Sequence, residues 1–76
     1  MWIHDNPTGL LKIRSDGQDR YLLEIDGVSC GSFETPEEAA EKVACFQTGY
    51  YDWDSLRFTG CYFPETLDDW DEYKAF

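Results

Sequence analysis

Carboxylates are the most numerous side chains in this sequence that could do chemistry, and a dense group of them lies near its end. Asp68, Asp69, Asp71 and Glu72 flank Trp70. A calcium loop needs alternating ligands, a glycine turn and a closing glutamate, and this run has none of these. Acid–base catalysis needs a cleft that shifts two carboxyl pKa values apart, and a 76-residue chain offers little burial. We therefore expect a solvated acidic face or a partner-binding face.

The thiols and the single histidine give no metal or nucleophile motif. Cys30, Cys45, Cys61 and His4 have the right number for a structural zinc site, but the cysteines are about fifteen residues apart. Such sites usually take two ligands from one tight turn. His4 is the only candidate base for a thiol nucleophile, and we expect it to be exposed near the N-terminus. With no phosphate loop or dinucleotide fingerprint either, we expect no enzyme, metal or cofactor.

Length and charge restrict the possible functions. The chain suits one small domain over residues 1–76, and its hydrophobic fraction of 42% is that of a folded protein. The net charge of −10 favours basic partners and repels both nucleic acid and anionic membranes. The start lacks the basic and apolar runs of a signal peptide, and no apolar stretch could span a membrane. A reduced cytoplasmic protein with free thiols is expected.

One helix stands at the centre of the predicted fold, within Phe33 to Gly49. Thr35 is a good N-cap, Pro36 suits the first helical position, and Glu38 completes a capping box. Gly49 can end the helix in the left-handed conformation. One face carries its apolar and small residues, which need a sheet to pack on: Ala39, Ala40, Val43, Phe46 and Gln47.

Three strands are predicted before the helix. Asp26-Gly27 is the strongest hairpin signal, because both central positions of a type I′ turn need positive φ. It pairs Ile25 with Val28, and it implies further pairs of Leu23 with Cys30 and Tyr21 with Ser32. The strands cover 10–14, 20–25 and 28–33, and residues 1–9 are expected as a lid or short edge strand. The fold class is α+β, a three-stranded antiparallel sheet packed on one α-helix with an aromatic, acidic C-terminal extension.

This register assigns the two faces of the predicted sheet. Tyr21, Leu23 and Ile25 face the helix, joined by Leu11 and Ile13 from the first strand. The opposite face collects three of the chain's six basic residues beside Leu22 and Glu24: Lys12, Arg14 and Arg20.

The stretch Gly31-Ser32-Phe33-Glu34-Thr35-Pro36-Glu37-Glu38-Ala39-Ala40, after two hairpins, resembles the strand-to-helix junction of the plant ethylene-response-factor DNA-binding domain. It is also similar to the junction in the arm-binding domain of phage integrases. The resemblance covers residues 10–49. It implies a three-stranded sheet plus helix whose outer face reads the DNA major groove, with Lys12, Arg14 and Arg20 on the matching face. Glu24 departs from that pattern, and the sheet holds no Trp.

From Tyr50 onward the composition changes. Residues 50–76 hold nine of the thirteen aromatic residues, seven acidic residues and two basic ones. A short extended piece is expected within 57–63, followed by a short helix capped at Thr66. On that helix Leu67, Trp70 and Tyr73 would share one face. The rings either pack against the small sheet-plus-helix core or form a binding surface, and some could do each.

The sequence favours a small acidic protein-interaction module, a regulator or inhibitor of a basic partner. A mimic of DNA is one version of this function. Its candidate partner-binding residues are Trp53, Asp68, Asp69, Trp70, Asp71 and Glu72. The alternative is a nucleic-acid-binding domain that uses Lys12, Arg14 and Arg20 on the outer sheet face.

We expect aromatic rings of the C-terminal third to cover that outer face, whose apolar centre is Leu22. Trp53, Phe63 and Trp70 are the rings suited to this, and nearby acids would offset the local positive charge. If this third instead packs beside the helix, the outer face stays open and nucleic-acid binding gains support.

Overall fold

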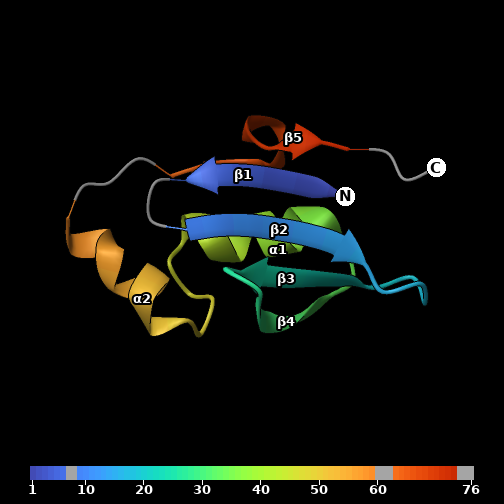
Figure 1. Cartoon of the computed structure of the whole chain (residues 1–76), viewed down its shortest axis with the longest axis horizontal. Coiled ribbons are helices and arrows are strands. Elements are labelled where there is room, and N and C mark those ends of the chain that lie inside the picture. Colours follow the sequence, from blue (N-terminus) through green and yellow to red (C-terminus); the bar gives the residue numbers. More distant parts are fainter. Residues whose placement is uncertain (7–8, 60–62, 74–76) are drawn as a thin grey trace.

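A five-stranded antiparallel sheet with helix α1 across one face forms the body of the protein (Figure 1). The computed structural model describes residues 1–6, 9–59 and 63–73. The sheet order is β4-β3-β2-β1-β5, with β1 (Trp2–Asn6), β2 (Gly9–Ser15), β3 (Tyr21–Ile25), β4 (Val28–Phe33) and β5 (Asp71–Glu72). The helices are α1 (Pro36–Ala44), α2 (Tyr51–Asp54) and the 3-10 turns η1 (Ser55–Phe58) and η2 (Leu67–Asp69).

The expectation of mixed α and β structure agrees with this architecture, but the three-stranded sheet on one helix is wrong. Two further strands widen the sheet. β1 pairs along its whole length with β2, from Trp2 opposite Ile13 to Asn6 opposite Gly9, and it lies inside the sheet instead of forming a lid. β5 adds two residues to the other side of β1. A two-residue strand is too short to show any alternation in sequence.

The predicted hairpin turn is confirmed, and the register beyond it is broken by a bulge. Asp26 and Gly27 both have positive φ, 51° and 82°, and Ile25 pairs with Val28. Further along, Leu22 pairs with Ser32 and Tyr21 with Phe33, one residue away from the expected partners.

Gly31 lies within that bulge and has a φ of 130°, a value that L side chains rarely adopt. The extra residue in β4 turns Phe33 toward the helix, where it packs on the core, and leaves Ser32 exposed. The predicted pair Tyr21–Ser32 is therefore wrong, because the bulge shifts the register by one residue. Leu23 and Cys30, also a predicted pair, lie at the bulge itself, where the register is interrupted.

The core between sheet and helix follows the predicted faces. Leu11, Ile13, Leu23 and Ile25 are each no more than 1% exposed, and they face the buried side of α1. On that side, the fully buried residues are Ala39, Ala40 and Val43. Burying a Leu or Ile side chain contributes about 1.5–3 kcal/mol, so this layer supplies most of the hydrophobic stabilisation.

Helix α1 begins where the capping signals predict. The Thr35 hydroxyl accepts a hydrogen bond of 3.2 Å from the backbone N–H of Glu38.

The predicted end of α1 at Gly49 is wrong. The helix ends at Ala44, and Phe46 takes the left-handed conformation with φ of 54°. The N–H of Phe46 bonds to the carbonyl of Val43 (3.1 Å), and that of Gln47 bonds to the carbonyl of Lys42 (3.0 Å). This is a Schellman ending with Phe in place of the usual Gly, and it leaves Gln47 exposed.

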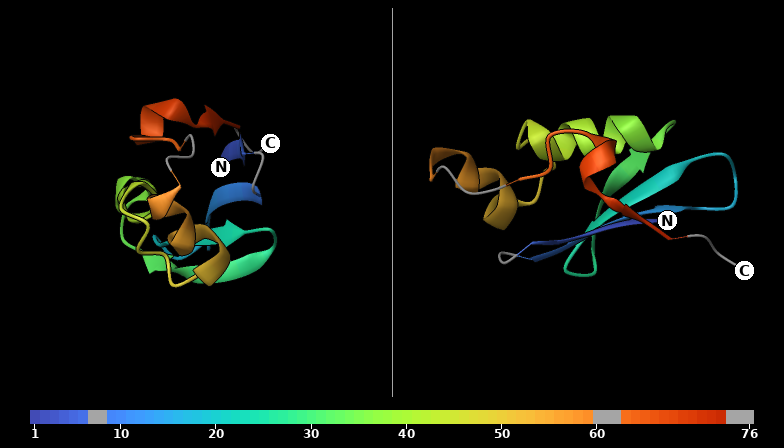
Figure 2. Two further views of the ribbon diagram at one scale, coloured as in Figure 1. Left: turned by 90° about the vertical axis from the view of Figure 1, so that its left-hand side faces the viewer. Right: turned by 90° about the horizontal axis from the view of Figure 1, so that it is seen from above.

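The C-terminal third packs on the helix side of the sheet, so the expectation that its rings cover the outer face is wrong. Figure 2 shows η2 and α1 on the same side of the strands. Trp53 stacks on Phe46 with ring centroids 5.3 Å apart, and Phe63 meets Phe46 edge-on at 5.1 Å. Trp70 is 5% exposed and lies over β1, with its ring centroid 6.0 Å from that of His4.

The extra width of the sheet explains this placement. α1 lies across β2, β3 and β4, which leaves the helix-side surface of β1 uncovered by α1. Trp2 and His4 lie on that surface, because they pair directly with Ile13 and Leu11. Trp70 and η2 complete the layer there, and His4 is consequently half-buried instead of exposed as expected.

The predicted helix after Thr66 is shortened to the three residues of η2. Its start is as expected, but Trp70 is extended with ψ of 150°, so Leu67, Trp70 and Tyr73 do not share a helix face. The short extended piece expected within 57–63 falls partly outside the described residues. Cys61 also lies outside them. In the described parts of the chain, no helix has the length and apolar character needed to cross a membrane.

Candidate functional site

The outer face of the sheet carries basic and acidic residues side by side. Lys12 lies directly opposite Glu24 on the neighbouring strand. Arg14 donates from its Nε to the Glu24 carboxylate at 2.5 Å. Glu24 therefore neutralises part of the positive charge that the sequence places on this face.

Arg20 is engaged with strand β4. Its Nε donates to the Ser32 hydroxyl at 2.7 Å, and a terminal nitrogen donates to the Ser32 carbonyl at 3.1 Å. The register also puts Asp5 and Asp71 on the outer face, since they pair with Leu10 and Ile3. The three predicted bases thus share one face with three acids, and together they form no uniform basic patch.

The two tryptophans among the predicted partner-binding residues lie in the core. Trp53 is 1% exposed, and its Nε1 donates to the Val43 carbonyl at 3.1 Å. Trp70 is nearly as buried and belongs to the same cluster. Both rings hold the C-terminal third against α1 and the sheet, so in this arrangement neither is available to a partner.

The predicted acidic residues divide into two groups. The Asp69 carboxylate accepts hydrogen bonds from the backbone N–H of Glu65 (2.9 Å) and of Thr66 (3.4 Å), so it fixes the start of η2. Asp68, Asp71 and Glu72 are exposed. Their charges therefore face solvent along the C-terminal segment.

A shallow groove runs between α1 and this C-terminal segment, and we call it the α1–η2 groove. Its volume is about 330 Å³, and its lining is Glu37, Ala40, Glu41, Glu65, Thr66 and Leu67. Leu67 is half-buried against the core and supplies apolar surface to the groove, whereas Ala40 is only 1% exposed. The carboxylate-bearing residues come from both walls, two from α1 and one from the segment that precedes η2.

None of the described basic residues lines the α1–η2 groove. Among the residues that the structure describes, the single ion pair is Arg14–Glu24 on the opposite face of the sheet. The groove therefore combines an apolar lining with carboxylates that no described cation neutralises, an arrangement suited to a ligand with both apolar and cationic groups.

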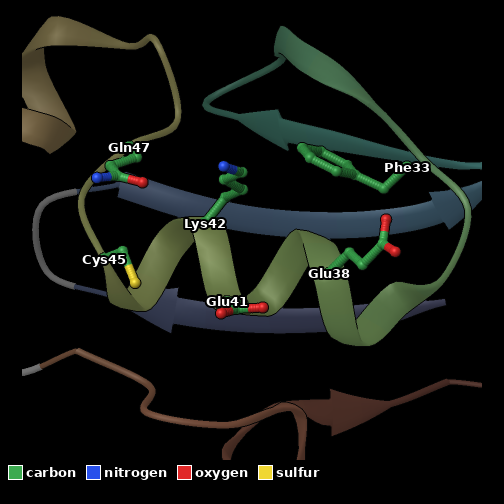
Figure 3. A pocket seen from close by; sticks show the side chains of 6 residues that line it. All are labelled: Phe33, Glu38, Glu41, Lys42, Cys45 and Gln47. Carbon is green, nitrogen blue, oxygen red and sulfur yellow. The ribbon is translucent and has the colours of Figure 1, made fainter.

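A second groove lies between α1 and the edge strand β4 (Figure 3). It has a volume of about 300 Å³ and is lined by Phe33, Glu38, Glu41, Lys42, Cys45 and Gln47. Lys42 gives this groove mixed charge. Its strand edge is also interrupted by the Gly31 bulge, a common way of preventing further strand pairing.

Two exposed aromatic residues lie outside the sites predicted from the sequence. Tyr51 and Phe58 are each 80% exposed on the segment formed by α2 and η1, and the Arg57 guanidinium lies 4.6 Å from the centre of the Phe58 ring. Tyr51 and Phe58 are seven residues apart, a spacing that places two side chains on the same side of a helix, and this spacing was the signal for them in the sequence. Asp54 in the same segment is structural, because it accepts hydrogen bonds from Thr48 and Gly49.

The thiols of Cys30 and Cys45 are free, and Cys45 is exposed. Burial raises the pKa of the Cys30 thiol, and nearby Asp54 and Glu24 raise it further, against a lowering backbone hydrogen bond. Within the described ranges, no three His, Cys, Asp or Glu side chains are grouped so that they could hold a metal ion.

The two surfaces with distinctive chemistry are thus the acidic α1–η2 groove and the mixed-charge outer sheet face, on opposite sides of the sheet. The resemblance of residues 10–49 to plant and phage DNA-binding domains stays a prediction. No protein-family model, curated protein or solved structure shows a significant match to this chain.

Proposed function

We propose that this protein is a small acidic interaction module that binds a basic protein and regulates or inhibits it by occupying its basic surface. The proposal rests mainly on the α1–η2 groove, in which Glu37, Glu41 and Glu65 surround apolar surface and the described part of the chain contributes no basic residue to the lining. A net charge of −10 would also steer such a partner toward the protein and speed their association. We place this function in the cytoplasm, where free thiols persist.

Energetics favour a combined apolar and charged contact. A single exposed ion pair contributes only about 0–1 kcal/mol. Burial of an apolar side chain contributes more, about 1.5–3 kcal/mol. Affinity would therefore come mainly from apolar burial, and the carboxylates would select a basic partner and set the association rate.

The test is calorimetric titration with a synthetic lysine- and arginine-rich peptide at several salt concentrations. The variant Glu37→Gln/Glu41→Gln should weaken binding about fivefold, because it removes two attractive charges of modest strength. The matched control is Asp19→Asn/Asp52→Asn, which makes the same change in net charge at exposed positions outside the groove lining. Equal weakening by the two double variants would show that only net charge matters, and absence of binding at low salt would refute the proposal.

A second candidate function is nucleic-acid binding on the outer sheet face. It is favoured by one observation, that neither α1 nor the described part of the C-terminal third covers the face carrying Lys12, Arg14 and Arg20. Against it stands the pairing of Arg14 with Glu24.

Fluorescence anisotropy with a labelled DNA duplex separates the two candidates. Salt-sensitive binding that is lost in Arg14→Gln/Arg20→Gln would favour the nucleic-acid function. We expect no binding at physiological salt, since phosphate contacts need a basic footprint.

A further inference from the structure

We infer that the α1–η2 groove recognises a short segment of the partner in which one aliphatic side chain is flanked on both sides by Lys or Arg. This inference rests on the proposed function and specifies its ligand. Three properties of the groove favour this ligand: its lining residues, their charges, and the contacts that hold the η2 wall in place.

The lining favours an aliphatic side chain. Ala40 is the smallest residue with a side chain, so α1 recedes at this point, and Leu67 from η2 supplies apolar surface on the other wall. Thr66 is the one lining residue that is polar without charge. An aliphatic group placed here would cover the half-buried Leu67 side chain, whereas a polar group would find few partners at the bottom of the groove.

The charges favour cations on both sides of that group. Glu37 and Glu41 are four residues apart on α1, so they lie on one face of the helix and repel each other. Glu65 stands on the opposite wall. By contrast, the neighbouring face of α1 places Lys42 four residues after Glu38, the favourable order for opposite charges. Glu41 also borders the second groove beside Lys42, whereas, of these two grooves, Glu37 and Glu65 line only the α1–η2 groove. A flanking Lys or Arg on each side of the aliphatic group would supply a cation to each wall.

The wall formed by η2 is held in place before any partner arrives. The Asp69 carboxylate fixes the backbone of Glu65 and Thr66. Trp70, which follows directly, is buried in the core. A groove with fixed walls loses little conformational entropy on binding, which favours recognition of a short segment.

Other occupants fit less well. A second copy of this chain would bring a surface of the same net negative charge toward the carboxylates, and nucleic acid or an anionic membrane would bring its own negative charge. A purely apolar peptide would leave three carboxylates facing a desolvated contact without partners. An aliphatic residue within a basic segment satisfies both parts of the groove.

The experiment uses the full chain and two synthetic peptides of equal charge. One has the sequence Gly-Lys-Lys-Leu-Lys-Lys-Gly with blocked ends, and the other has Ser in place of Leu. Affinity is measured by calorimetry at low salt, and the contact surface is mapped by amide chemical shifts in NMR titrations. We expect the Leu peptide to bind about tenfold more tightly, as burial of one aliphatic side chain implies, with the largest shifts at residues 37–41 and 65–67.

Two variants test the apolar and the charged contribution separately. Leu67→Ser should abolish the preference for Leu by lowering the affinity for the Leu peptide to that for the Ser peptide. Glu65→Gln changes an exposed residue and should weaken both peptides while keeping the preference. The NMR spectrum of each variant verifies that it is folded.

The outcomes separate the inference from the function beneath it. Equal affinity of the two peptides for the unmodified protein, or shifts centred away from the groove, would overturn the inference and leave a charge-driven interaction module standing. Failure of both peptides to bind at low salt would overturn the proposed function as well.

Discussion

The indole Nε1 of Trp53 donates a hydrogen bond of 3.1 Å to the main-chain carbonyl of Val43. This contact joins α2 to the last turn of α1, and the same ring stacks on Phe46, the left-handed residue that follows the end of α1. One side chain thus fixes both the end of the main helix and the direction of the chain beyond it.

Trp53→Phe should lower the free energy of unfolding by about 1 kcal/mol through loss of this hydrogen bond, with some packing loss in addition. Trp53→Ala should cost about 3–5 kcal/mol, because the whole buried ring is removed. Urea denaturation followed by circular dichroism measures both. Tyr51→Ala, two residues away and 80% exposed, is the control and should change stability by less than about 0.5 kcal/mol.

Thr35→Ala should cost about 1 kcal/mol, because the Glu38 N–H loses its side-chain acceptor at the start of α1. Thr35→Ser keeps the hydroxyl and should stay close to the original stability. Thermal unfolding of the three proteins compares them. If Ala and Ser behaved alike, the cap would contribute nothing measurable.

Gly31→Ala should destabilise the protein by about 1–3 kcal/mol through backbone strain at a φ of 130°. An added Cβ would come no closer than 3.5 Å to Phe33, so crowding is not the cause. Ser29→Ala, at an exposed position in the same strand, provides the matched control. A stability unchanged by the Gly31 substitution would mean that β4 runs without the bulge.

Trp70→Ala should cost about 3–5 kcal/mol, since this ring is buried over β1. It should also weaken the β5–β1 pairing, seen as faster amide exchange at Tyr73, whose N–H bonds to the Met1 carbonyl. Tyr73→Ala is the comparison, because that side chain is half-exposed. A small effect of Trp70→Ala would show that the C-terminal segment is not anchored through this ring.

The Cys30 thiol should ionise above the pH at which an ordinary cysteine does, because burial raises its pKa. The measurement is thiolate absorbance against pH in Cys45→Ser/Cys61→Ser, where Cys30 is the remaining thiol. The folded state disfavours the thiolate, so Cys30 contributes stability below the ordinary thiol pKa. That contribution is lost as the pH rises through the raised value. Cys30→Ala should remove this part of the pH dependence, and an ordinary titration curve would contradict the prediction.

Local signals in the sequence predicted the elements that depend on neighbouring residues. The cap at Thr35, the Asp26-Gly27 turn and the buried alternation of Leu23 and Ile25 are of this kind, and all three are found. The end of α1 was missed because a glycine was available at Gly49, whereas the ring of Phe46 stabilises a left-handed residue three positions earlier. Tertiary packing there outweighs backbone preference.

The candidate site depends on long-range contacts and was harder to predict. Pairing of β5 with β1 links residues about 70 positions apart, and no local pattern specifies it. The expected three-stranded sheet lacked β1 and β5, so it gave no sign that the helix side of the sheet extends beyond α1. Trp53 and Trp70 were therefore expected on the outer face, which they do not reach. Acidic character was readable from composition. The groove between Glu65 and α1 could not be predicted, because it forms only when the C-terminal segment folds back against α1.

The ends of the described chain exchange two main-chain hydrogen bonds, from Met1 to the Tyr73 carbonyl at 2.9 Å and from Tyr73 to the Met1 carbonyl at 2.6 Å. β1 precedes β5 by about 70 residues, so one edge of β1 gains its neighbour only after the chain has folded back. Until then Trp2 and His4 lack the cover of Trp70, and the groove has only one wall. A chain that stops before Leu67 would therefore lack the η2 wall of the groove, so the site between α1 and η2 exists only once residues far apart in the sequence have come together.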